Sequence, residues 1–293
     1  MNRLLLTGCG TALLTPFKNN EVDYQAFAAS VERQVESGIN FLVPLGSTAE
    51  TPCLDDEERI NLLECCREHA HGLPLVVGAG TNSFVHTVKN MKLLDSHGVD
   101  AFLIVVPYYN KPTQEGLYQY FKEIAQSTSK DIVLYNVPGR TGLNLATETT
   151  LRLAEIDNII AIKEASSNYQ QISEIICNAP AGFTVLSGND NETLSLIASG
   201  AHGVISVASN IVPELMMELV NAIRNGNLIK ARNLHFKLMP LFKNCFVESN
   251  PIPAKAAMHA LGLMDNSLRS PLTPASESTY QLMVDTLRQL DML

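Results

Sequence analysis

The sequence predicts an α/β fold, a (β/α)8 TIM barrel followed by a small C-terminal helical domain. Two observations carry this prediction. Short runs rich in valine, isoleucine and leucine alternate with helical periodicity eight times within the first 225 residues. The runs are apolar almost throughout, which is typical of parallel strands that are covered on their outer face. A doubly wound parallel sheet is the alternative that this pattern leaves open.

The eight units follow one another in a regular order. The expected strands lie in the segments "GTALLTPF", "INFLVPL", "LPLVVGAG", "DAFLIVVP", "DIVLYNVP", "IIAIKEA", "FTVLSG" and "GVISV". The helices that follow them are expected near residues 23–38, 55–70, 85–98, 115–127, 147–154, 169–177, 192–199 and 213–225. The third helix rests on the helical spacing of Val85, Val88, Met91 and Leu94.

The rhythm changes after residue 225. Ala231, Leu234, Leu238 and Leu241 form a helical stripe, and two further helical segments follow with no strand between them. We therefore expect a barrel that carries the active site in residues 1–225 and a helical domain in residues 226–293.

Composition excludes several classes of protein. The chain of 293 residues is 46% hydrophobic, enough for a large core, yet no segment approaches the ~20 unbroken apolar residues of a membrane span. Its net charge of −9 argues against a nucleic-acid partner but not against a small anionic substrate. The seven histidines are scattered and indicate no metal site.

The cysteines and the amino terminus point to a cytoplasmic protein. "LLLTGCG" looks like a lipoprotein cleavage box, but its three leucines are too few for a signal peptide, so a first strand is expected there. The six cysteines show no CxxC spacing and are expected to be reduced.

Polar side chains collect where the expected strands end. In a barrel the carboxyl ends of the strands form one rim, at which the chemistry takes place. Hydroxyls, phenols, one guanidinium and one amine are expected to meet there: Ser47, Thr48, Tyr108, Tyr109, Tyr135, Arg140, Lys163, Gly188, Asn189 and Asp190.

Lys163 closes the apolar run "IIAIKEA". A lysine at a strand end often only extends its ammonium to water. At the enclosed mouth of a barrel, however, burial favours a neutral and nucleophilic amine, so Lys163 is the candidate for a Schiff base. Lys255, the other lysine in apolar company, is expected on the surface of a helix.

Tyr135 and Arg140 can each be interpreted either as a structural residue or as a functional one. A tyrosine that ends a strand is often an amphipathic plug, but next to the amine it could relay protons. Arg140 lies in the turn "PGRTG" and is either a solvated charge or a bidentate ligand of a substrate carboxylate.

With these residues placed, the sequence resembles the dihydrodipicolinate synthases, pyruvate-dependent enzymes of the class I aldolase type in lysine and diaminopimelate biosynthesis. The resemblance runs through the whole chain, and "YNVPGRTG" together with "IKEA" is its most specific part. Other matching segments are "GSTAE", "PYYNKPTQEGL", "LSGND" and "ESNPIPAKAA". Sialic-acid lyases of the same superfamily share the lysine and the tyrosine but usually lack the arginine.

The resemblance implies a role for each residue of the rim. Lys163 would form the imine with pyruvate, and Tyr135 would donate and accept protons with Ser47 and Tyr109 as a relay. Thr48, Ile205 and Gly188 would contact substrate, and Arg140 would bind the carboxylate of L-aspartate 4-semialdehyde. The product would be 4-hydroxy-tetrahydrodipicolinate, with no metal or organic cofactor.

One loop departs from the family pattern. The usual Thr-Thr-Gly-Glu is Ser47-Thr48-Ala49-Glu50 here. Serine keeps the relay hydroxyl but is less restricted in its rotamers. Ala49 carries a Cβ where glycine is usual, which leaves the backbone of this loop less certain.

The resemblance also implies assembly and regulation. A homo-oligomer is expected, a tetramer built as a dimer of dimers, in which Tyr109 enters a neighbour's active site. Lysine-sensitive relatives bind the effector in a cleft whose asparagine and tyrosine match Asn82 and Tyr108. The cleft's glutamate falls on His86 and its histidines on Asp56 and Arg59, so weak or absent inhibition by lysine is expected.

Two other functions stay open at this point. One is another Schiff-base aldolase or lyase of the superfamily, acting on a sialic acid or a keto-deoxy sugar acid. The other is a catalytically silent barrel that serves as a sensor or scaffold, which the presence of both Lys163 and Tyr135 disfavours.

Overall fold

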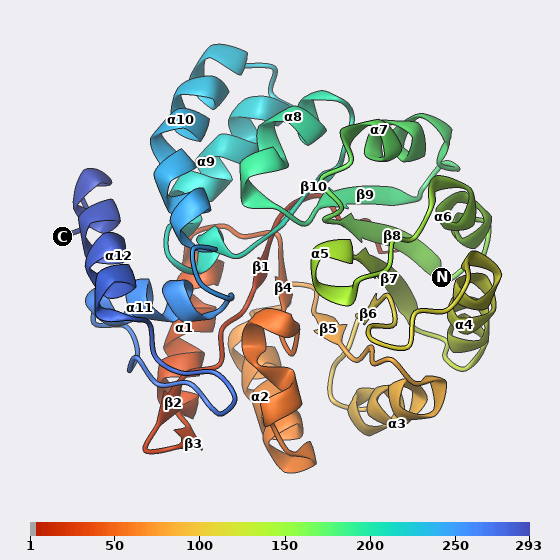
Figure 1. The fold of residues 1–293 in the computed structure, drawn as a ribbon, viewed down its shortest axis with the longest axis horizontal. Helices are drawn as coiled ribbons and strands as arrows, with labels where there is room; N and C mark the ends of the chain where they lie inside the picture. Colours follow the sequence, from red (N-terminus) through yellow and green to blue (C-terminus); the bar gives the residue numbers. More distant parts are fainter. Residues whose placement is uncertain (1–3) are drawn as a thin grey trace.

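Eight parallel strands pair side by side in the computed structural model, which describes residues 4–293. A further parallel bridge between Leu42 and Leu75 joins the two ends of this order, so the sheet closes into a barrel and not into a doubly wound sheet (Figure 1). In spatial order the strands are β4 (Phe41–Val43), β1 (Gly8–Ala12), β10 (Gly203–Ser206), β9 (Thr184–Ser187), β8 (Ile159–Glu164), β7 (Asp131–Asn136), β6 (Ala101–Val105) and β5 (Val76–Gly78).

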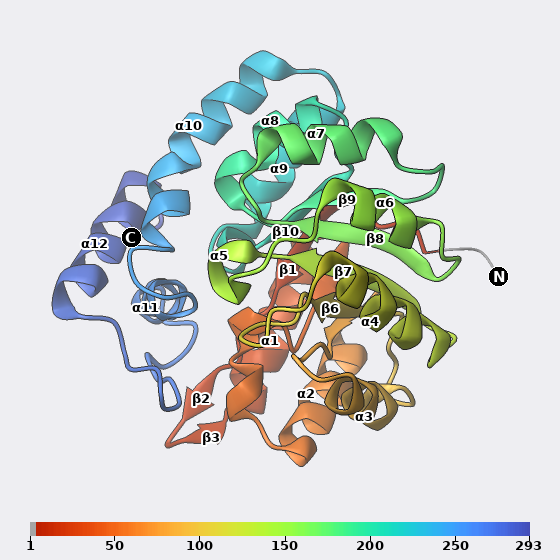
Figure 2. The ribbon, with the colours of Figure 1, turned by 45° about the vertical axis from the view of Figure 1, so that its right-hand side comes forward.

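The helices that connect the strands cover the outside of the barrel (Figure 2). The first begins where the Asp23 side chain accepts a hydrogen bond from the Ala26 N–H, and the second begins with a capping box between Asp55 and Glu58. The eight expected helices are all present: α1 (Tyr24–Glu36), α2 (Asp56–His69), α3 (Phe84–Leu94), α4 (Gln114–Gln126), α6 (Thr147–Ala154), α7 (Tyr169–Asn178), α8 (Thr193–Ala198) and α9 (Pro213–Arg224).

Two small elements are not evident from the sequence. Strands β2 (Phe17–Lys18) and β3 (Glu21–Val22) form a short hairpin before α1. The "PGRTG" segment, expected as a turn, contains the one-turn helix α5 (Pro138–Thr141). Proline fits the first position of a helix because its missing N–H has no acceptor there in any case.

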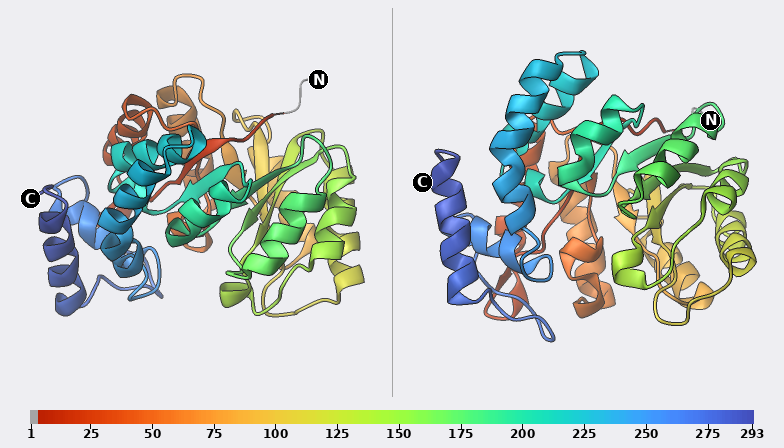
Figure 3. Two further views of the ribbon diagram at one scale, coloured as in Figure 1. Left: turned by 90° about the horizontal axis from the view of Figure 1, so that it is seen from above. Right: turned by 45° about the horizontal axis from the view of Figure 1, so that its top comes forward.

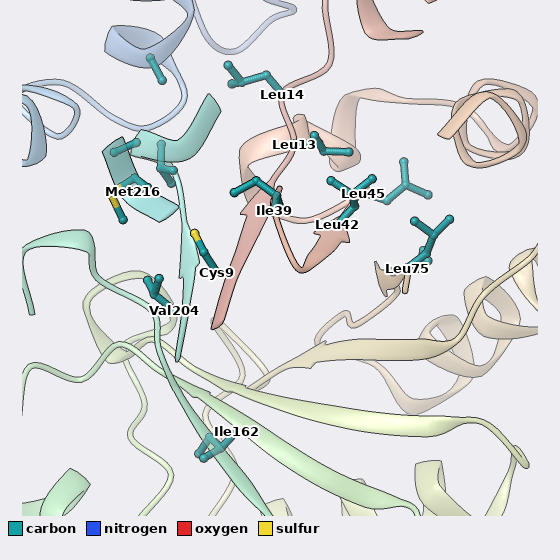
Figure 4. Packing of buried hydrophobic residues seen from close by; sticks show 14 of the residues in the cluster. Cys9, Leu13, Leu14, Ile39, Leu42, Leu45, Leu75, Ile162, Val204 and Met216 are labelled. Atoms are coloured by element: carbon teal, nitrogen blue, oxygen red, sulfur yellow. The ribbon is translucent and has the colours of Figure 1, made fainter. Parts of the chain in front are cut away.

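Side chains from the strands form two separate clusters. The outer cluster lies between strands and helices, where Cys9 of β1, Leu42 of β4 and Met216 of α9 pack in one layer (Figure 4). The inner cluster fills the barrel and includes Tyr135 and Ile205. Successive side chains of a strand point to opposite faces, so every second residue of a strand reaches the interior.

Three helices follow the barrel and gather on one side of it, away from α4 and α6 (Figure 3). They are α10 (Leu228–Asn244), α11 (Ile252–Ala260) and α12 (Glu277–Gln289). Within residues 4–293, no helix is long and apolar enough to span a membrane.

Two expectations about side chains are wrong. Lys255 is not on a helix surface but is 0% exposed, because α11 is buried along all of its residues from Ile252 to Met258 and has no solvent face on that stretch. Val85 is 69% exposed, and the buried face of α3 is formed by Thr87, Met91 and Leu94 instead. The helix itself lies where its apolar spacing predicts it.

Candidate active site

Lys163 and Tyr135 lie next to each other on neighbouring strands. They are register partners of β8 and β7. The Lys163 Nζ lies 4.4 Å from the centroid of the Tyr135 ring, and Lys163 is only 5% exposed. The end of the lysine side chain therefore packs against the face of the aromatic ring. The sequence prediction that these two side chains meet in the barrel is confirmed.

The side chain of Glu164 fixes the end of β8 through hydrogen bonds. This carboxylate lies on the opposite face of the strand and accepts hydrogen bonds from the Asn136 and Gln171 side-chain amides and from the Ser166 N–H. Burial raises the pKa of Glu164, and these donors oppose the shift. The strand position that carries Lys163 is therefore fixed by a buried polar network.

Gly188 follows β9 beside this network. Its N–H donates to the Glu164 carbonyl oxygen at 2.7 Å. A Cβ at this position would lie 2.7 Å from the Cβ of Ala165. A glycine therefore permits the two backbones to approach closely next to the strand that carries Lys163.

A cavity of about 380 Å³ opens at this rim. Four of the sequence-predicted rim residues line it, namely Ser47, Tyr108, Tyr135 and Arg140. Lys163 adjoins the cavity through its contact with the ring of Tyr135. The volume suits a small substrate held by a few polar groups within an otherwise apolar wall, which includes Leu103, Val105 and Val137.

Ser47, Thr48 and Ala49 form a single 3-10 turn after β4. Ser47 is exposed to the cavity, whereas Thr48 and Ala49 are buried. The left-handed position of the loop falls on Glu50, with φ of 54°, and not on Ala49. The Cβ of Ala49 is thus compatible with the loop, since helical backbone accepts any L-residue.

Arg140 and Thr48 are linked by Asn250, a residue outside the barrel strands and their connecting helices. The Asn250 side-chain amide donates to the Thr48 Oγ1 at 2.9 Å, and the Asn250 backbone carbonyl oxygen accepts from the Arg140 guanidinium at 3.3 Å. The sequence reasoning assigned no role to Asn250. The only signal was its place in "ESNPIPAKAA", one of the segments that carry the resemblance.

Tyr109 lies apart from the other candidates. It is 89% exposed and does not line the cavity, whereas its neighbour Tyr108 does. Its backbone is left-handed, with φ of 72°, which is uncommon for a bulky residue. Within one chain the expected relay from Tyr135 through Ser47 to Tyr109 is therefore not assembled.

Ile205 and Asp190 complete the neighbourhood. Ile205 is fully buried and shares the inner cluster with Tyr135. The Asp190 carboxylate accepts hydrogen bonds from the backbone N–H groups of Val207 and Ala208, just after Ile205. Burial raises the pKa of Asp190, and its hydrogen bonds and the charge of Lys163 lower it. No cluster of histidine, cysteine and acidic side chains within residues 4–293 could hold a metal ion.

The chain matches known proteins along almost all of its length. Residues 5–290 match the model of the dihydrodipicolinate synthetase family. The chain is 46% identical over 294 residues to the 4-hydroxy-tetrahydrodipicolinate synthase of Thermotoga maritima, covering 99% of this chain and 100% of that protein.

Solved structures agree with this match. The crystal structure of dihydrodipicolinate synthase from Thermotoga maritima superposes with a TM-score of 0.97 at 46% identity, over 99% of this chain and 100% of that one. The enzyme from Acinetobacter baumannii, solved in complex with pyruvate, superposes with a TM-score of 0.95 at 38% identity, over 98% of this chain and 99% of that one. The chain belongs to the dihydrodipicolinate synthetase family.

Proposed function

We propose that Lys163 is the amine through which this enzyme condenses pyruvate with L-aspartate 4-semialdehyde. The activity itself, that of a 4-hydroxy-tetrahydrodipicolinate synthase in lysine and diaminopimelate biosynthesis, follows from the family and from relatives that match over the full length, and it makes the protein a lyase. The observation that supports the role of Lys163 is the buried contact between its Nζ and the Tyr135 ring at the barrel mouth.

The chemistry begins with the Lys163 amine. It attacks the carbonyl carbon of pyruvate, and loss of water gives an imine, which acts as an electron sink. Removal of a methyl proton gives an enamine, whose carbon attacks the aldehyde of L-aspartate 4-semialdehyde. The substrate's amino group then closes the ring and displaces Lys163, so no metal or organic cofactor is required.

Protons must move at several of these steps. Tyr135, whose ring contacts the amine, is the proposed proton donor and acceptor, and Ser47 lies on the same cavity wall. Thr48 and Ile205 are the proposed pyruvate contacts, and Gly188 is a further proposed substrate contact. Arg140 also lines the cavity, where its guanidinium is the proposed ligand of the second substrate's carboxylate.

The assembly is a second part of the proposal. Exposed apolar side chains of Phe84 and Val85 lie close to the loop of Tyr109, because the Asn110 amide donates to the Asn82 carbonyl oxygen at 2.8 Å. Such a patch is typical of a protein interface. We place Tyr109 in the active site of a second copy and expect a tetramer, a dimer of dimers, in the cytoplasm, where the six free thiols stay reduced.

The division of the chain is the third part. We treat residues 1–225 as the catalytic barrel and residues 226–293 as a helical domain that contributes Asn250 to the site.

Borohydride trapping tests the role of Lys163. Reduction in the presence of pyruvate should inactivate the enzyme and add one reduced pyruvyl group to the peptide that contains Lys163, as mapped by mass spectrometry. Lys163→Ala should not be trapped. Label on Lys255, or label that does not depend on pyruvate, would contradict the assignment.

A panel of aldehydes with pyruvate then checks the second substrate, and Arg140→Ala should raise the KM of L-aspartate 4-semialdehyde more than that of pyruvate.

A further inference from the structure

A buried ion pair joins the active-site loop to the C-terminal helices. The Lys255 Nζ lies 2.5 Å from the Glu50 Oε1, and both side chains are 0% exposed. Removing two charges from water costs about as much free energy as their attraction returns, so such a pair contributes little to stability compared with apolar side chains of similar size. The pair directly follows the turn of Ser47 and Thr48 in the chain, which points to a role in holding this part of the site.

Glu50 is the residue that joins the two turns of the loop. It separates two 3-10 turns, Ser47–Ala49 and Thr51–Cys53, and it adopts a left-handed backbone that a non-glycine residue seldom takes. A residue keeps such a conformation only where its surroundings enforce it. The second carboxylate oxygen, Oε2, accepts the backbone N–H of Arg269 at 3.0 Å. Both oxygens of Glu50 are thus held by the C-terminal part of the chain.

Lys255 is equally fixed. Its ammonium donates to the Ser267 carbonyl oxygen at 2.9 Å and lies 4.2 Å from the centroid of the Phe17 ring. Arg269 contacts the same ring, at 4.5 Å. Its guanidinium forms two hydrogen bonds of 2.6 Å with Glu58 at the start of α2. Lys255 therefore has one preferred position, from which it can set the position of Glu50.

The loop is attached to the C-terminal segment at a second point. Asn250 lies five positions before Lys255, and its amide donates to Thr48 Oγ1. One short segment thus holds Thr48 directly and reaches Ser47 and Thr48 through Glu50.

We infer that Lys255 is a positioning residue for pyruvate, acting through its ion pair with Glu50 on the turn of Ser47 and Thr48. The inference rests on the proposed function, in which Thr48 contacts pyruvate and Ser47 lies on the wall of the same cavity. Lys255 touches no substrate. Without the pair, Glu50 loses one of the two contacts that hold its carboxylate, and the turn of Ser47 and Thr48 moves relative to Lys163.

The deciding variant is the double substitution Lys255→Met with Glu50→Gln, which keeps the volume and removes both buried charges. It should fold, with a melting temperature near that of the wild type. The pyruvate concentration for half-maximal borohydride trapping at Lys163 should rise about tenfold or more, because misplacement on the order of 1 Å can cost 10²-fold. The KM of L-aspartate 4-semialdehyde should change much less.

The matched control is Lys230→Met with Glu218→Gln. This pair, 2.7 Å apart, joins α10 to α9 at the surface and should leave both trapping and turnover unchanged. If the buried double variant does not fold, Lys255→Gln with Glu50→Gln gives the same decision, because it also removes both buried charges and lets the two amides form a neutral hydrogen bond.

Three outcomes separate the ideas. Trapping that needs more pyruvate in the buried variant but not in the control supports the inference. Wild-type pyruvate dependence in a folded buried variant overturns it and leaves the role of Lys163 intact. Absence of trapping at Lys163 in the wild type overturns the proposed role of Lys163 itself.

Discussion

The Lys163 amine lies 4.4 Å from the centroid of the Tyr135 ring, and the two residues are paired in register across β8 and β7. This relationship separates two contributions of one side chain. The ring contacts the amine, whereas the hydroxyl is the group that could carry a proton.

Replacement of Tyr135 by phenylalanine tests this separation. Tyr135→Phe keeps the ring beside Lys163, so the melting temperature should stay close to that of the wild type. Turnover should fall by roughly 10²-fold or more, the scale of a positioned acid–base group. Steady-state rates together with thermal unfolding give both values. A loss below tenfold would assign the proton transfer to another residue.

Gly188 should not tolerate a side chain. In Gly188→Ala the new Cβ would lie 2.7 Å from the Ala165 Cβ and 3.1 Å from the Glu164 carbonyl oxygen. Overpacking of this kind destabilises a protein by about 1–3 kcal/mol. Denaturant unfolding measures the loss. Gly139→Ala is the matched control, since no atom lies within 4 Å of its added Cβ, and equal stability of the two variants would contradict the prediction.

The stability of the protein should depend on Lys255 at alkaline pH. Burial lowers the pKa of Lys255 from 10.5 to about 8, against the opposing effect of Glu50. Between these values the unfolded chain holds a proton that the folded protein has lost, so the free energy of unfolding contributed by this group increases with pH. The contribution is complete above about 10.5 and disappears as the pH falls through about 8.

The measurement is the difference between the wild type and Lys255→Met. Their unfolding free energies, determined by urea from pH 7 to 10.5, should change relative to each other in favour of the wild type as the pH rises. Cys53, Glu58 and Arg269 lie in the same neighbourhood and are present in both proteins, so their own titration largely cancels. A difference that does not vary with pH would show that Lys255 keeps its proton throughout.

Oligomerisation should be necessary for full activity. Tyr109 is 89% exposed and does not line the cavity of its own chain, so the proposed role of its phenol requires a second copy. Sedimentation at assay concentration should show a dimer or a tetramer. Tyr109→Ala should lower turnover while the pyruvate dependence of trapping changes little. A monomer of full activity would refute the expectation.

Inhibition by lysine should be weak. The resemblance implies that His86 stands where lysine-sensitive relatives carry a glutamate. The Asp56 carboxylate is already paired with Arg59 at 3.5 Å and Lys89 at 3.3 Å. An effector ammonium would meet no free carboxylate from these residues, and Arg59 adds like charge. Initial rates at saturating pyruvate should show half-inhibition only above ~1 mM lysine. His86→Glu should increase the sensitivity, and submillimolar inhibition of the wild type would contradict the prediction.

The contact between Lys163 and Tyr135 could be predicted because its geometry is set by local rules. Lys163 and Tyr135 each lie one residue before the end of an apolar strand, and parallel strands place their carboxyl ends on one rim. Because they belong to consecutive strands of the eight-unit pattern, they are expected to be neighbours. Arg140 and Ser47 could be placed at the rim for the same reason, although the helical turn α5 around Arg140 was not evident.

The supports of the site could not be predicted in this way. Asn250 and Lys255 act on residues about two hundred positions earlier in the chain, and no periodicity encodes such a contact. In "IPAKAAM" small apolar residues surround the lysine on every side, so spacing alone does not tell which face of α11 meets solvent. The exposure of Val85 could not be predicted for a related reason, since an apolar residue in a helix can face a partner instead of the core.

The contacts from Asn250 to Thr48 and from Arg269 to Glu50 span 202 and 219 positions of the chain. Contacts of such separation form late, because the loop that they close is long. During synthesis, the strands that carry Lys163 and Tyr135 emerge before the segment that fixes the loop of Ser47. A nascent chain that has completed its barrel therefore still lacks the contacts that hold this loop, and the site matures only when the last helices leave the ribosome and dock.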